Sequence, residues 1–524
     1  MKKCLFILFL IVFSSCSPKY YEKSADKEVY KIIEEKKEKI KEDKLPIKLN
    51  EDTKVETIIL SLKDALIMAS SKNRDYQTQK ENIYISVLDL TYQRYLLSPN
   101  LKLTGNIDWN KNSTEEITSN LNLNLFKELS TGGEISINLK EAILKYLTGD
   151  KKSAFQSILT FNIFQPLFKG TGRKIAIEKL IQSERNVVYQ IRDFLRFQKS
   201  FSIDIIRDYL NIFLYKKRME NFYTNYINLK TTRERIEMLS DAGRLPPFQV
   251  DQAKQNEYTA YQRWINAQNF YYTNLNSFKF KIKLGLSPSV NLVLNDPEIE
   301  KLFEKPVPEI KIDLQKFIDY ALEKRLDLIT EYEKLEDSKR KVEIAINNLK
   351  NKIDFKGKIE SSGDIKTRPN IDLNNETEYK AGIDFEIPFN KLPQRNEYKR
   401  TLIEYERQKR NFEKKVDTVR KEIIDSYRNL QEAYQSYIVQ LNSLQLAEKR
   451  VESTDLLLQA GRATTRDLLE SQEAYLSAQN NLINSIVNFI LEYLNFLYLT
   501  EKFEVDENGI WKGDINEILK ISQE

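Results

Sequence analysis

Several short segments of the chain alternate strictly between apolar and polar residues. From residue 101 to 109, for example, Leu101, Leu103 and Ile107 are separated by Lys102, Thr104 and further polar residues. Side chains in a β-strand point to opposite faces with a period of two, so the pattern predicts strands with one apolar and one polar face. Four main strands are predicted, near residues 101–109, 157–165, 353–360 and 381–387, together with an extra pair near 119–140 that turns at Gly132 and Gly133.

Two much longer stretches, 174–241 and 394–460, contain no proline or glycine. Their apolar residues recur at steps of three and four, which is the spacing of a coiled-coil seam. A continuous helix of this length reaches ~100 Å at ~1.5 Å per residue. A second apolar stripe returns along residues 468–496. We predict that each stretch begins an antiparallel helical hairpin, with its tip at Gly243 or Gly461.

The chain uses one unit twice. Residues 62–75 align on 314–327 without a gap, which places Ala69 on Ala321 and Asp75 on Asp327. Self-similarity of this kind indicates a repeated architecture. We predict a first repeat at 58–286 and a second at 313–499, joined by a linker at 287–312 with several prolines and followed by a tail at 500–524.

Residues 1–15 have the features of a secretory signal peptide: two lysines, a short apolar run, and small residues before Cys16. The run is too short to span a bilayer as a helix. The segment from Phe13 to Cys16 resembles a bacterial lipobox, with Phe13 where leucine is usual. We expect fatty chains such as palmitate on Cys16, which would anchor the chain in lipid. The alternative is an ordinary signal peptide with a chance cysteine. Residues 16–57 are expected to form a charged, mostly solvated tether.

Composition removes several kinds of site. The chain has 524 residues, with 82 Lys and Arg against 77 Asp and Glu, and no histidine. A formal charge of +5, without a basic and aromatic stacking platform, gives no reason to expect nucleic acid as a partner. The two cysteines are Cys4, inside the signal, and Cys16. The mature chain therefore lacks disulfides and the usual Cys and His groups of catalytic and metal sites, and we predict no enzyme activity and no cofactor.

The strand pattern alone suits either a soluble sheet or a membrane sheet. A soluble sheet packs its apolar face on a core, but the very long helices beside these strands are polar and offer none. Strands of about 9–11 residues cross a bilayer when tilted. Unpaired backbone groups along a strand edge cost several kcal/mol each in lipid, so four strands must join other copies to close a barrel. The extra pair is expected to be an extracellular hairpin or an extension of the strands.

The order and spacing of these features resemble the TolC-type outer-membrane efflux protein family over nearly all of the mature chain. The resemblance rests on the twofold repeat, on the strand-to-helix junctions at 165–170 and 387–389, and on the tips at 242–244 and 460–472. It implies an α+β membrane protein that forms a homotrimer. Each subunit would give four strands to one transmembrane β-barrel and its helices to a long coiled-coil barrel in the periplasm. It also implies an exit channel that works with a periplasmic adaptor (membrane fusion) protein and an inner-membrane pump.

The resemblance further implies a periplasmic gate. The family's gate lies beside the second tip and uses rings of acidic residues, which here match Asp467 and Glu470; at the first tip the family's acid falls on Gln249. Carboxylates of three copies converging on one axis would form a negative constriction. Alternatively, Asp467 is an ordinary acid at a helix N-terminus and Glu470 a capping-type residue three positions on.

Residues at the two tips are candidates for adaptor docking: Gly243, Arg244, Gly461, Arg462 and Arg466. The glycines suit tight turns that need a positive φ. The family often has an arginine two residues after the tip glycine, where this chain has Ala463. Either Arg462 or Arg466 would have to replace it.

Three hypotheses of function remain open from the sequence. The first is a duct for small-molecule efflux, and the second is the same duct serving type I protein secretion. The third is a structural lipoprotein, a periplasmic coiled coil with a soluble sheet. The features above do not identify the cargo or the class of pump.

Overall fold

The structure, a computed structural model, describes residues 25–33, 57–111, 115–147, 154–284, 291–294, 299, 312–364 and 377–513. The predicted signal peptide, Cys16 and most of the tether lie outside these residues. The chain divides into two units. The first contains residues 81–192 and 330–413 and the N-terminal residues up to 41; the second contains residues 42–80, 193–329 and 414–524.

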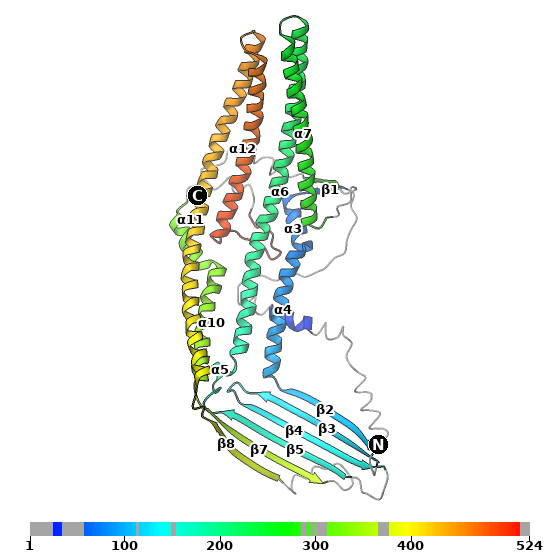
Figure 1. Ribbon diagram of the computed structural model, residues 1–524, viewed down its shortest axis with the longest axis vertical. Coiled ribbons are helices and arrows are strands. Elements are labelled where there is room, and N and C mark those ends of the chain that lie inside the picture. Colours follow the sequence, from blue (N-terminus) through cyan, green and yellow to red (C-terminus); the bar gives the residue numbers. More distant parts are fainter. Residues whose placement is uncertain are drawn as a thin grey trace. The chain divides into compact units, whose positions relative to one another are not determined.

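The first unit is built on a six-stranded antiparallel sheet (Figure 1). Its strands are β2 (Asn100–Lys111), β3 (Glu115–Glu128), β4 (Glu134–Tyr146), β5 (Ala154–Pro166), β7 (Lys352–Asp364) and β8 (Thr377–Glu386). Strands that follow each other in this series are neighbours in the sheet. The strands have 10 to 14 residues, which meets the ~9–11 that a tilted strand needs to cross a bilayer.

The prediction of four strands per chain is wrong, because the extra pair joins the middle of the sheet as two full strands. β3 pairs with β2 and β4, and β4 pairs in turn with β5. The tight turn between them lies at the helix end of the sheet, where the Gly172 amide donates to the Thr131 carbonyl at 3.0 Å. Gly132 has φ +87° there, and a Cβ on it would clash with the Gly170 carbonyl oxygen. The expected extracellular hairpin is therefore a central part of the sheet.

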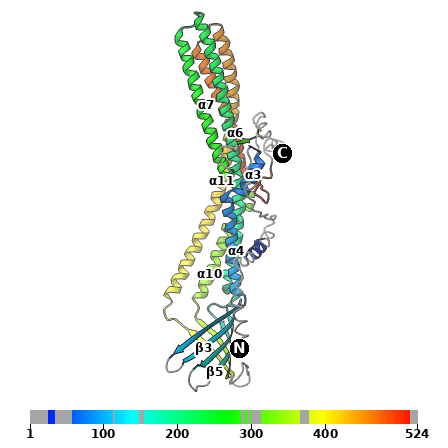
Figure 2. The same cartoon turned by 90° about the vertical axis from the view of Figure 1, so that its right-hand side faces the viewer.

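The pairing register gathers apolar side chains on one face of the sheet. Leu103, Leu123, Leu139 and Leu159 form one row across β2 to β5. The odd-numbered residues continue this face across β7 and β8, where Tyr379 is 74% exposed. None of the described helices lies across either face of the sheet in Figures 1 and 2. Within the part of the chain that the structure describes, this apolar face is therefore left uncovered by helices.

The even-numbered residues form the opposite, polar face. On β2 to β5 this face consists mostly of amides and hydroxyls; Asn162, for example, donates to the Ser136 hydroxyl at 3.1 Å. On β7 and β8 it is charged, and Lys356 pairs there with Asp384. The sheet thus separates a face suited to lipid from a face suited to water.

Four long helices each contribute residues to both units. They are α4 (Arg74–Leu97), α6 (Glu178–Asp241, after the short α5, Arg173–Ala176), α10 (Leu326–Asn348) and α11 (Leu392–Gln459). α6 has 64 residues and α11 has 68, so each is ~100 Å long at ~1.5 Å per residue. In the second unit α6 turns back into α7 (Pro247–Lys281) and α11 into α12 (Thr465–Leu499), and both tips lie at the same end of that unit (Figure 1).

The apolar helix α12 forms much of the core of the second unit. It is long and apolar enough to cross a membrane, the only such helix among the described residues. Its apolar residues instead pack within the unit, where Leu468 and Phe489 are buried. The Phe496 ring lies 5.2 Å from the ring of Phe317 on α9 (Leu314–Lys324), measured between centroids. These contacts identify α12 as a core helix of the hairpins.

A buried ionic network joins distant parts of the second unit. Arg325, between α9 and α10, is 2% exposed. Its guanidinium donates two hydrogen bonds of 2.9 Å to Asp327 and one of 2.8 Å to Glu422 on α11. Asp327 also pairs with Arg196 at 3.1 Å and with Lys415 at 2.9 Å. Burial alone would raise the pKa of Asp327, but these cationic partners outweigh it and hold the pKa well below its usual range.

The helices that open the two predicted repeats have matching bounds. α3 (Leu62–Lys72) and α9 each have 11 residues, and each is followed at once by a long helix, α4 or α10. Ser61 caps the first and Asp313 the second, through side-chain oxygens that accept from backbone amides.

The predicted tether, linker and tail each contain regular structure or fixed contacts. In the tether, residues 25–33 are helical, and Asp26 accepts a 2.7 Å hydrogen bond from Tyr84 of α4. In the linker, β6 (Asn291–Leu294) pairs in parallel with β1 (Thr57–Leu60). In the tail, the Asn508 carbonyl accepts from the Tyr76 hydroxyl at 3.0 Å. The segment after α12 therefore docks on the start of α4.

Candidate gate and docking tips

The two hairpins turn through the same backbone motif. Each tip has one amide-to-carbonyl hydrogen bond over three residues and one over five: Gly243 to Ser240 and Arg244 to Leu239, both at 2.9 Å, and Gly461 to Leu458 at 3.0 Å and Arg462 to Leu457 at 2.8 Å. This is the Schellman motif, which ends a helix at a residue of positive φ. Gly243 has φ +71° and Gly461 has φ +70°, as the sequence predicts for both tips.

Replacing Gly461 by alanine is expected to destabilise the end of α11 by about 1 kcal/mol, because an L side chain is strained at positive φ. A Cβ there meets no atom within 4 Å, so backbone strain is the only cost. Amide exchange in the last turn of α11 should become about fivefold faster. Gly382→Ala is the control, since Gly382 also has open space but no positive φ. An unchanged exchange rate in Gly461→Ala would contradict this assignment.

Asp467 caps the start of α12. Its carboxylate accepts hydrogen bonds from the Thr464 amide at 2.8 Å and from the Thr464 hydroxyl at 2.6 Å. Thr464 in turn accepts from the Asp467 amide at 3.2 Å, which completes a capping box. The hydrogen bonds from Thr464 lower the pKa of Asp467, so the carboxylate is ionised at neutral pH. Because the side chain is exposed, it caps the helix and also places a negative charge at the tip.

Glu470 is not part of this cap, so its alternative role as a capping-type residue is wrong. Its carboxylate pairs with Arg450 of α11 at 2.9 Å, and the Glu470 side chain is 61% exposed. Sequence reasoning missed Arg450, which lies on the opposite arm of the hairpin. In a single chain, the charge of Glu470 is therefore partly balanced by a neighbouring cation.

Gln249 holds the two tips together. The Thr465 hydroxyl donates to its Oε1 at 2.6 Å, and Thr465 is fully buried. A second link runs between the ascending helices, where Arg235 of α6 donates to Asp455 of α11 at 3.3 Å. The Arg235 guanidinium also lowers the pKa of Asp455. At this position Gln249 is a neutral acceptor between hairpins, where the family has an acid.

The arginines of the tips lie at the surface. Arg244, Arg462 and Arg466 are exposed, and none of them pairs with an acidic group among the residues that the structure describes. Ala463, at the position where the family often has an arginine, is half-buried. The tips therefore carry cations that are available to another molecule, together with the exposed turns at Gly243 and Gly461.

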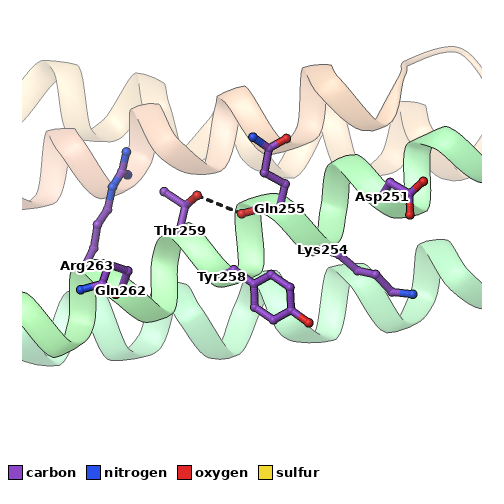
Figure 3. A pocket seen from close by; sticks show the side chains of 7 residues that line it. All are labelled: Asp251, Lys254, Gln255, Tyr258, Thr259, Gln262 and Arg263. Atoms are coloured by element: carbon purple, nitrogen blue, oxygen red, sulfur yellow. Dashed lines mark hydrogen bonds between the residues drawn. The ribbon is translucent and has the colours of Figure 1, made fainter.

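A shallow groove of about 640 Å³ runs along the surface of α7 (Figure 3). It is lined by Asp251, Lys254, Gln255, Tyr258, Thr259, Gln262 and Arg263, all from this one helix. Arg263 pairs with Glu473 of α12 at 2.6 Å, and Thr259 donates to the carbonyl of Gln255 at 2.9 Å. A groove along one helix is a contact surface and does not enclose a small ligand.

Exposed apolar residues follow the same helix at intervals of seven. They are Tyr258, Ile265 and Tyr272, and Tyr258 is 70% exposed. α11 likewise exposes Val439 and Leu446. Apolar residues with a heptad spacing are typical of helices that pack against a partner helix. The second unit thus presents two stripes that its own helices leave uncovered.

The second half of the sequence matches a known family. Residues 318–485 match the family described as outer membrane efflux protein. These residues belong to the outer membrane efflux protein family. They include Asp467, Glu470 and the second tip, whereas Gln249 and the first tip lie outside the match. No curated protein matches the chain.

Solved channel structures share the fold over most of the chain. A structure of CusC, from work on its folding and transmembrane channel formation, aligns with this chain at a TM-score of 0.62 and 12% sequence identity. The alignment covers 88% of this chain and 98% of the CusC chain. The CmeC outer membrane channel of Campylobacter jejuni aligns at a TM-score of 0.60 and 14% identity, and the alignment covers 88% of this chain and 89% of the CmeC chain. The outer membrane protein VceC of Vibrio cholerae aligns at a TM-score of 0.61 and 15% identity, and the alignment covers 84% of this chain and 95% of the VceC chain. The similarity in fold to these outer membrane channels therefore extends over the first half of this chain as well as the second.

Proposed function

We propose that this chain is the outer-membrane exit duct of a tripartite efflux or export system. One observation carries the proposal: a six-stranded sheet exposes a largely apolar face, interrupted on β4 by Glu141, and an opposite polar face, and none of the described helices covers either. An environment with lipid against the apolar face and water against the polar face suits both faces of the sheet. The match of residues 318–485 to outer membrane efflux proteins supports the same function.

The duct is proposed to be a homotrimer whose helical hairpins extend into the periplasm. There they would meet a periplasmic adaptor protein and, through it, an inner-membrane pump that supplies the energy. The exposed arginines and glycine turns of the tips are the proposed docking surface for the adaptor. Acyl chains on Cys16 would add an anchor in outer-membrane lipid.

Detergent-resistant oligomers test this assembly. The purified protein is expected to migrate in an SDS gel as a trimer without heating and as a monomer after boiling. The competing hypothesis, a structural lipoprotein with a soluble sheet, predicts a monomer in both lanes. The uncovered apolar face argues against that hypothesis, because a soluble sheet would bury it.

We further propose that Asp467 and Glu470 line the periplasmic gate as carboxylate rings. Support comes from the exposure of both side chains and from the lowered pKa of Asp467, which keeps it charged. Rings of like charge in a narrow pore attract multivalent cations. Arg450, beside Glu470, would moderate this field, so Asp467 is expected to contribute the larger share.

Replacing Asp467 by asparagine and Glu470 by glutamine together should weaken block of the open pore by a trivalent cation. The half-blocking concentration is expected to rise by about tenfold or more, since several kT of attraction is lost. Trimer formation should persist, because Thr464 still caps α12. The double variant Glu413→Gln/Asp417→Asn, with the same charge change far along α11, should leave block unchanged. Equal block in the gate variant and the wild type would refute the carboxylate rings.

A further inference from the structure

The six-stranded sheet ends in two open edges, β2 on one side and β8 on the other. Within the described residues neither outer edge pairs with another strand. Open edges cannot persist in a bilayer, where each unpaired backbone group costs several kcal/mol. A strand from another molecule must therefore cover each edge.

The two edges are complementary in direction. β2 leaves the end of α4 and runs away from the helices, whereas β8 runs back toward the start of α11. When copies stand side by side, β8 of one copy is antiparallel to β2 of the next. This continues the alternation that the sheet keeps throughout.

The two edges also match in chemistry. On the apolar face β2 offers Leu101 and Leu103, and β8 offers Ile383 and Phe385. On the polar face at the helix end, Lys102 of β2 would meet the acidic end of β8, which carries Asp384 and Glu386. Apolar and oppositely charged cross-strand pairs both stabilise a sheet.

We propose that three copies close one eighteen-stranded barrel through three seams between β8 and β2. The proposal rests on the trimeric duct proposed above and takes its strand number from the sheet, which supplies six strands per copy. The hairpin of β3 and β4 is part of the wall, because both strands are paired on both sides. Leaving it out would break the ladders that join β2 to β3 and β4 to β5.

The extra strands widen the bore. With a strand spacing of ~4.8 Å and a tilt of ~40°, eighteen strands close at a diameter of about 36 Å and twelve strands at about 24 Å. The polar face that would line the bore carries neutral amides and hydroxyls on β2 to β5: Thr104, Asn106, Thr118, Asn120, Asn122, Asn124, Ser136, Asn138, Thr160 and Asn162. Such a bore passes hydrated cargo much bulkier than a drug-sized molecule, so the gate at the helical end sets the size limit.

Distances between equivalent positions of the trimer test the strand number. A spin label is placed on the apolar face with Ile359→Cys, in a chain whose mature form has Cys16 as its only other cysteine. Backbone positions related by the threefold axis lie about 31 Å apart in an eighteen-stranded barrel and about 21 Å apart in a twelve-stranded one. The matched comparison deletes residues 115–147, which removes β3 and β4 and leaves β2 and β5 with their apolar faces on the same side. The wild-type distance should exceed that of the deletion variant by about 10 Å.

A second measurement covers the case in which the deletion variant does not fold. Ile383→Cys is combined in turn with Leu101→Cys, Leu103→Cys and Gly105→Cys, and the thiols are oxidised with copper phenanthroline. At least one pair should give a covalent ladder that ends at the trimer, and the single variants should not. Equal spin-label distances in the wild type and the deletion variant, or a seam that never cross-links, would overturn the proposal. If the protein still conducts ions in that case, the duct stands and only the strand number fails; a non-conducting monomer would refute the duct itself.

Discussion

Replacing Arg325 by methionine is expected to lower the free energy of unfolding by about 3–5 kcal/mol, which is the usual cost of removing one partner from a buried ionic network. The substitution removes three hydrogen bonds and leaves the carboxylates of Asp327 and Glu422 short of a cation. Asp327 keeps Arg196 and Lys415, whereas the ion pair of Glu422 with Arg325 is lost. Methionine fills much of the space, so the loss reports charge more than volume.

Lys324→Met is the matched control, one residue earlier in the chain. Lys324 is about half exposed, and within the described part of the chain its ion pair is with the exposed Glu323, so its replacement should leave the free energy of unfolding nearly unchanged. Urea unfolding in detergent, followed by helical circular dichroism, measures both variants. Equal midpoints would show that the network does not stabilise the unit.

The same network has a pH signature. The pKa of Asp327 is lowered in the folded protein, so its contribution to stability is complete above the ordinary aspartate pKa of ~3.9 and is lost as the pH falls through the lower, folded-state value. Acid should therefore destabilise the wild type more steeply than Arg325→Met, which has already lost the part of this contribution that Arg325 supplies.

Replacing Leu139 by arginine is expected to cost about 2–4 kcal/mol in each copy, because the side chain would enter the middle of the lipid face of β4. Leu139 stands in register with Leu123 and Leu159, at the centre of the apolar face. Its neighbour Asn138 lies on the polar face, so Asn138→Arg puts the same charge into water. That control should cost less than about 1 kcal/mol.

Refolding from urea into lipid vesicles measures both variants on one scale, and the yield of heat-sensitive trimer provides a second readout. Leu139→Arg should assemble poorly and Asn138→Arg nearly as well as the wild type. If the two variants behave alike, the sheet does not face lipid on one side. If Asn138→Arg is the more damaging, the assignment of the two faces is reversed.

The sequence predicts the elements of this fold well, because their signals are local. A period of two identifies strands and assigns each residue to a face, and the absence of proline and glycine identifies α6 and α11. The cap at the start of α12 is an equally local signal, because Thr464 and Asp467 are three residues apart, but sequence reasoning assigned the capping-type role to Glu470 and missed Thr464. Gly243 and Gly461 are likewise recognisable from the helices that stop at them.

Contacts between distant residues were not predictable in this way. The place of β3 and β4 depends on which strands pair, and the alternation within each strand carries no such information. Arg325 meets Glu422, 97 residues away, and Glu470 meets Arg450 across a turn. In the sequence, Glu422 and Arg450 are each surrounded by many other charged residues of the same sign. Only the folded chain shows that these two form the ion pairs.

Ion conductance of the purified protein in a planar lipid bilayer tests the duct most directly, because it requires barrel, trimer and bore together. Stable single-channel steps are expected from the heat-sensitive trimer, and none from the boiled monomer. A well-folded, delipidated protein that stays in aqueous buffer as a single subunit and never conducts would contradict it.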